Sequence, residues 1–148
     1  MAHVRTQIRD RMATTLTSGV ALVSSRVYTS RTYPVTTANL PALTVFANSE
    51  TSSLVTIGTS KTLQRRLSVS VDVYARATSD LDDDIDAITV QVEEAIAADF
   101  TVNGLAKEAL LISTDIEYSG EAEQQIGIAH MTYDVLYHTS VADVETAK

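Results

Sequence analysis

The sequence predicts an α+β protein with a mixed or antiparallel β-sheet of about five strands and two main helices packed on one face of that sheet. Two segments repeat apolar residues at helical spacing, one near the start of the chain and one in its middle. The remaining segments are rich in β-branched residues, and one alternates apolar and polar residues. Strands grouped before and after a helix favour this fold class, in the order α-β-β-β-α-β-β.

The size and composition of the chain fit one globular domain. It has 148 residues, of which 45% are hydrophobic and 20% charged, so we expect a single domain over residues 1–148. The absence of cysteine excludes disulfides and zinc–thiolate sites. No signal peptide or membrane-spanning run is visible, so we expect a soluble protein without a membrane partner.

The first helix is expected from His3 to Thr17, because apolar residues recur there every four positions and Ser18-Gly19 follows as a stop. These apolar residues are Val4, Ile8, Met12 and Leu16. The β-branched run from Val20 to Thr29 predicts a strand. A loop from Ser30 to Leu40 and a short strand from Ala42 to Ala47 are expected next.

The segment from Asn48 to Lys61 is rich in serine and threonine and predicts a long excursion, either a loop or an extended hairpin, at about residues 48–64. Long loops in compact domains are usually functional. We therefore expect this excursion to contact a partner. The strand from Leu67 to Tyr74 follows, with strictly alternating apolar and polar residues.

The second helix is expected from Ser79 to Phe100. Its apolar residues follow helical spacing, and Ser79 with Asp82 has the spacing of a capping box. The apolar residues are Leu81, Ile85, Ile88, Val92 and Ile96.

Two strands are expected to complete the domain, one from Leu110 to Tyr118 and one from Gln125 to Thr139. The apolar phase of the last strand changes along its length, which predicts a β-bulge near Ala129-His130. The tail over residues 141–148 is expected to be frayed.

No motif with catalytic, cofactor or metal chemistry is visible in the sequence. The aspartates from Asp80 to Asp86 lack the glycine of a calcium loop and fit the acidic first turn of a helix. His130 and His138 lie too far apart along one strand to share a metal, and His3 lies near a terminus. No glycine-rich phosphate loop or nucleophile elbow occurs. We therefore predict a protein that is not an enzyme and has no cofactor.

The net charge of −8 disfavours a protein whose main role is to bind nucleic acid. It is compatible with a channel through which a polyanion passes without being bound. Several arginines at strand ends are either anchors for an acidic neighbouring subunit or simply solvated. Together with the apolar residues of the excursion they give the candidate subunit or partner interface. Its residues are Arg26, Arg31, Leu54, Val55, Ile57, Lys61, Arg65 and Arg66.

Several segments resemble the tail terminator (tail completion) proteins of long-tailed bacteriophages, of the lambda gpU-like kind. They are the helix that begins at His3, the strand and loop from Arg26 to Pro34, the segment from Leu40 to Phe46, Asp115 to Tyr118, and the long last strand. The resemblance implies a virion protein at the head-proximal end of the tail, assembled in the host cytoplasm. It implies a hexameric ring that caps the tail tube, ends its polymerisation and joins the neck or head completion protein, with DNA passing through the lumen.

Two alternatives remain open at the level of sequence. One is another head–tail joining component, such as a neck adaptor or tail completion protein of similar build. The other, less favoured, is a small ligand-binding domain, which requires a concave site with convergent polar groups.

Overall fold

The computed structural model describes residues 2–24, 26–29, 40–76, 81–119 and 126–148. It contains two α-helices, α1 (Val4–Gly19) and α2 (Leu81–Ala98), and a short 3-10 helix, η1 (Ala21–Val23). The strands are β1 (Val27–Tyr28), β2 (Ala42–Leu54), β3 (Thr62–Arg76), β4 (Glu108–Ser119) and β5 (Ile126–Ser140).

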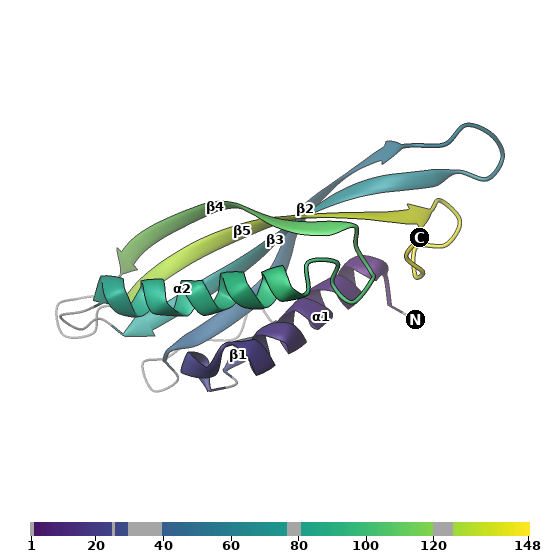
Figure 1. The fold of residues 1–148 in the computed structure, drawn as a ribbon. Helices are drawn as coiled ribbons and strands as arrows, with labels where there is room; N and C mark the ends of the chain where they lie inside the picture. Colours follow the sequence, from purple (N-terminus) through teal and green to yellow (C-terminus); the bar gives the residue numbers. More distant parts are fainter. Residues whose placement is uncertain (1, 25, 30–39, 77–80, 120–125) are drawn as a thin grey trace.

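These strands form one mixed sheet in the order β1-β2-β3-β5-β4, with β1 parallel to β2 and the other pairs antiparallel. Both helices lie on one face of the sheet (Figure 1). The predicted fold class and element order are therefore confirmed.

The core lies between the helices and the sheet, as the periodicity predicts. All four apolar residues expected on the inner face of α1 are buried, as are all five expected on α2. The alternating residues Leu67, Val69, Val71 and Val73 of β3 are also buried. Helix ends differ from the prediction by a few residues, and the predicted cap at Ser79 lies outside the described residues.

The predicted strand from Val20 to Thr29 is largely wrong. Val20 instead ends α1 by donating its N–H to the carbonyl oxygen of Leu16, and η1 follows before Ser24 takes a positive φ of 50°. Of the described residues in this run, only Val27 and Tyr28 pair with β2 as a strand. Val20 and Val23 are fully buried, so this β-branched run packs into the core without forming a continuous strand.

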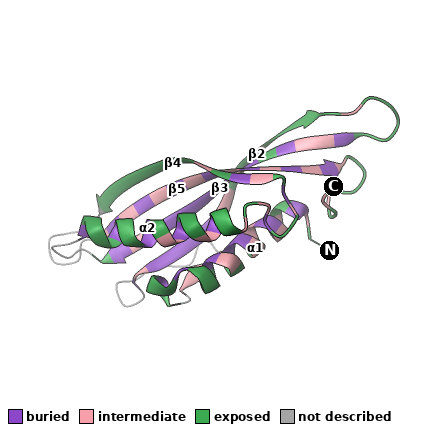
Figure 2. Ribbon diagram, in the orientation of Figure 1, coloured by how far each residue is buried: buried purple, intermediate pink, exposed green. Residues whose placement is uncertain are grey.

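The excursion after Asn48 is a hairpin. β2 and β3 pair from Ala42 with Tyr74 to Leu54 with Leu63, with one register shift between Ala47 and Ser49. The paired strands extend past the body of the sheet in Figure 1, and most of the extension is exposed in Figure 2. We call residues 49–68 the hairpin arm. The strand pattern of its β2 half could not be predicted, because the side chains from Thr51 to Leu54 are polar or exposed on both faces.

The bulge predicted near Ala129-His130 is wrong. β5 pairs with β3 without a register shift, and the residues that face the helices include Gly127 and Ala129. Gly127 leaves room for the close packing of α2, since a Cβ atom placed on it would lie 2.7 Å from Ile85 Cδ1. Ile126 and Ile128 lie on the opposite face. The other register shift in the sheet lies in β4, between Leu111 and Ser113.

The two helices cross at a contact between Gly19 and Ala95. A Cβ atom placed on Gly19 would lie 2.8 Å from Ala95 Cβ, which is much closer than ordinary carbon–carbon contact. Arg11 and Asp99 fix the same crossing with an ion pair of 3.0 Å. The close approach therefore depends on the missing side chain of Gly19.

We expect Gly19→Ala to destabilise the fold by about 1–3 kcal/mol, because the added methyl group would separate the helices. Urea unfolding monitored by circular dichroism measures this change. Adding Ala95→Gly to Gly19→Ala should recover part of the loss by removing the clashing methyl group. Strictly additive effects of the two substitutions would contradict this explanation.

Candidate assembly surfaces

The loop at the end of the hairpin arm has a defined shape. Val55 donates its N–H to the carbonyl oxygen of Thr62 at 3.1 Å, which closes the hairpin. The hydroxyl of Thr56 accepts the N–H of Thr62 at 2.8 Å and donates to the carbonyl oxygen of Ser60 at 3.3 Å. Gly58 turns the chain with a φ of +123°, which few other residues adopt.

Three aliphatic side chains are exposed at this end of the arm: Leu54, Val55 and Ile57. Ile57 has a relative exposure of 103%, so no part of the chain that the structure describes covers it. We call these three residues the apolar tip. Single exposed apolar residues are common, but three of them clustered on a projecting hairpin are typical of a contact with another protein.

The base of the arm is held by a buried polar cluster around Glu50. Its carboxylate accepts hydrogen bonds from Arg5 and Arg65, both at 3.0 Å, and from the hydroxyl of Tyr137. Arg65 also donates to the hydroxyl of Thr139 at 2.9 Å. The side chains of Glu50 and Arg65 are only 9% and 10% exposed. This Glu50 cluster ties the arm to α1 and β5.

The C-terminal segment lies beside the same region, so the expectation of a frayed tail over residues 141–148 is not met. Val141 donates its N–H to the carbonyl oxygen of Lys61 at 3.0 Å, and Val4 donates to that of Val144 at 2.9 Å. Lys148 donates to the carbonyl oxygen of His138, also at 2.9 Å. The tail thereby links the start of α1, the last strand and the arm.

The candidate interface residues divide into an exposed and an internally paired group. Lys61 is exposed near the apolar tip. Arg65 is buried in the Glu50 cluster, so within the subunit it has an internal role. Arg66 pairs with Asp134 at 2.6 Å, and Arg26 donates from Nε to the carbonyl oxygen of Pro41 at 2.8 Å. Arg31 lies outside the described residues.

Strand β4 forms one edge of the sheet and carries exposed apolar side chains. They are Leu110, Ile112, Ile116 and Tyr118. Ile116 and Tyr118 pair with Ala129 and Gly127 of β5, which places them on the helix side of the sheet. The hydroxyl of Tyr118 donates to Asp82 at the start of α2. An exposed edge with apolar side chains is a second candidate contact surface.

His130 lies between two carboxylates on the other face of the sheet. Its Nδ1 is 3.0 Å from Asp72 Oδ1, and its Nε2 is 2.9 Å from Glu117 Oε1. Burial alone would lower the pKa of His130, but the hydrogen bonds and charges of Glu117 and Asp72 outweigh burial and raise it. Burial raises the pKa of Asp72 as well. The sequence did not indicate this cluster, because it depends on the register of three strands.

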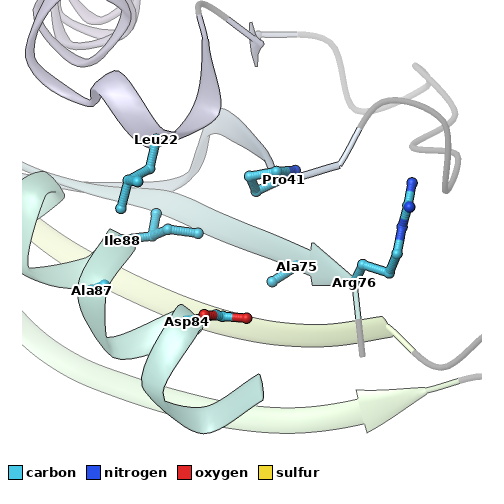
Figure 3. A pocket seen from close by; sticks show the side chains of 7 residues that line it. All are labelled: Leu22, Pro41, Ala75, Arg76, Asp84, Ala87 and Ile88. Carbon is cyan, nitrogen blue, oxygen red and sulfur yellow. The ribbon is translucent and has the colours of Figure 1, made fainter. Parts of the chain in front are cut away.

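A small pocket of about 300 Å³ lies at the far end of β3 from the arm. Figure 3 shows Leu22, Pro41, Ala75 and Ile88 around its apolar centre, with Asp84 and Arg76 at its sides. Among the described residues, Ala87 of α2 also lines it. We call these seven residues the end pocket. Its volume is at the lower limit for small-molecule sites, and most of its lining is apolar.

Within the described ranges, no group of three or more histidine, aspartate or glutamate residues is arranged to hold a metal ion. Among the helices described, none combines the length and apolar character needed to cross a membrane.

No protein-family model matches the chain, and no curated protein matches it in sequence. One solved structure with a similar chain is described as the virion of a native gene transfer agent (GTA) particle. The two chains are 16% identical, the match covers 90% of this chain and 92% of that one, and the TM-score is 0.36. Agreement at this level is too low to assign a family or a role.

We expect Glu50→Ala to destabilise the protein by about 3–5 kcal/mol, because Arg65 would remain buried without its counter-charge. The exposed pair of Arg66 and Asp134 provides the control, since Asp134→Ala should cost less than about 1 kcal/mol. Urea unfolding of the two variants measures both values. Equal effects would show that the Glu50 cluster does not anchor the arm.

The His130 cluster predicts a pH dependence of stability. A raised pKa in the folded state means that the folded protein binds the proton of His130 more tightly than the unfolded chain. While Asp72 and Glu117 stay ionised, the resulting stabilisation is fully present below the unfolded-state pKa of histidine, about 6.5, and is lost as the pH rises through the folded-state pKa. Between about pH 6 and pH 8 the unfolding free energy of the wild type should therefore fall. We expect a smaller fall in His130→Asn, because asparagine does not titrate. Parallel pH profiles for wild type and variant would contradict this.

Proposed function

We propose that the protein is a structural component of a phage-like virion, a tail terminator that forms a hexameric ring on the head-proximal end of the tail tube. In this role it ends tube polymerisation and joins the neck or head completion protein. It carries out no catalysis and requires no cofactor. The observation that carries the proposal is the hairpin arm (Figure 1), whose apolar tip is exposed and is not covered by any of the described residues.

The construction of the arm supports a role in assembly. A flexible loop with three aliphatic residues would lose conformational entropy on binding, whereas this arm is already ordered by strand pairing and by Thr56. The Glu50 cluster and the tail fix its base. A projecting element that is ordered in advance can bind a neighbouring subunit or the tail tube with little entropic loss.

The overall charge supports the passage of DNA through such a ring. The net charge of −8 repels the phosphate backbone, so DNA can move through the lumen without being held. The resemblance of the sequence to tail terminator proteins supplies the specific role. A neck adaptor of similar build is the alternative, and it would lie between the portal and the terminator.

Phage assembled without this protein separates the two roles. A terminator predicts tail tubes that grow beyond the normal length, because nothing ends their polymerisation. A neck adaptor predicts full heads beside unattached tails of normal length. Electron microscopy of the lysate measures tube length directly, and expression of the wild-type protein from a plasmid is the control.

We expect Ile57→Asp to weaken assembly by about ten- to a hundredfold, because a charge replaces an apolar side chain that becomes buried on binding. Sedimentation velocity over a range of concentrations, with and without tail tubes, measures the change. Phe100→Asp is the matched control, since Phe100 is also exposed, at 53%, but lies after the end of α2. Equal assembly of wild type and Ile57→Asp would remove the arm from the interface.

A further inference from the structure

The apolar tip and the end pocket lie at opposite ends of one strand. β3 begins at Thr62, next to the tip, and ends at Arg76, which lines the pocket. Its 15 residues span roughly 45 Å when extended. One subunit therefore cannot insert its own tip into its own pocket. Contact between the two requires a second molecule.

The end pocket has the size and chemistry to receive aliphatic side chains. Of the seven described residues that line it, five are apolar, namely Leu22, Pro41, Ala75, Ala87 and Ile88. Its volume of about 300 Å³ is small for a cofactor-sized ligand. Leu22 is 46% exposed at its edge, so it gains cover when the pocket is filled. An aliphatic side chain such as Ile57 matches this apolar lining.

The charged residue next to the tip and the charged residues at the start of α2 have opposite signs, although Arg76 also lines the pocket. Residues 51–61 contain one charged side chain, Lys61, which is exposed. The first turns of α2, beside the pocket, carry the exposed acids Asp82, Asp83, Asp84 and Asp86. Copies of a chain with a net charge of −8 repel one another overall. Lys61, next to the apolar tip, lowers this repulsion when it meets the acidic start of α2.

We propose that the apolar tip of one subunit inserts into the end pocket of the next copy of this chain, with Lys61 placed beside the acidic start of α2. The proposal rests on the ring assembly proposed above and assigns its contact surfaces. Tip and pocket are different surfaces, so the contact is heterologous and continues in one direction from copy to copy. Such a contact closes into a ring when its rotation permits.

A disulfide between copies tests this contact, and the chain has no cysteine of its own to interfere. The double variant Ile57→Cys/Ala87→Cys places one thiol at the tip and one in the pocket. Both positions are exposed, so neither substitution disturbs the core. We expect mild oxidation of assembled protein to give a ladder of covalent oligomers that ends at the ring size on a non-reducing gel. Reductant should return the ladder to monomer.

The matched control is Ile57→Cys/Ala97→Cys. Ala97 is an exposed alanine on the same helix, about 15 Å further along it and outside the pocket lining. A ladder that is equally strong in this control would overturn the proposal.

The remaining outcomes separate this inference from the proposed function. Oligomers of normal size in which the two introduced thiols of the first double variant do not cross-link would overturn the tip-in-pocket contact and leave the ring intact. A cross-link from the tip to the tail tube protein would do the same. A protein that stays monomeric at every concentration and on tail tubes would overturn both.

Discussion

The shape of the subunit depends on the hydrogen bonds and ion pairs that the carboxylate of Glu50 makes. Glu50 lies on β2 just after the register shift and gathers Arg5 of α1, Arg65 of β3 and Tyr137 of β5. A buried carboxylate is unfavourable unless it is paired, and here two guanidinium groups and a hydroxyl pair with it. Because the carboxylate and its three partners come from four separate elements, they fix the direction in which the arm leaves the sheet.

Small residues allow the helices to pack closely on each other and on the sheet. Gly19 lets α1 approach Ala95 of α2, and Gly127 leaves room on β5 for Leu81 and Ile85. The helices therefore cover the central strands tightly. The hairpin arm and much of β4 remain outside this cover and are exposed (Figure 2).

The sequence predicted what depends on periodicity and missed what depends on register. The inner faces of both helices and of β3 follow from apolar spacing, and the structure confirms them. The pairing along the arm has no such signal, since most of its serines and threonines are exposed and do not alternate with buried apolar residues. The His130 cluster needs the alignment of three strands, which no local pattern contains. The β-bulge predicted in β5 is wrong because Gly127 and Ala129 occupy inward positions that larger apolar residues would normally fill. The apolar pattern of the sequence therefore changes phase where the strand itself is regular.

The exposed edge of β4 has a consequence for the colloidal behaviour of the free subunit. An unpaired edge with apolar side chains is a template for uncontrolled strand pairing. Acidic residues alternate with the apolar ones along this strand, among them Asp115 and Glu117. Two such edges repel each other at neutral pH and low ionic strength. Salt or acid weakens that repulsion, so the conditions used to store the protein decide whether it stays dispersed before it meets its partners.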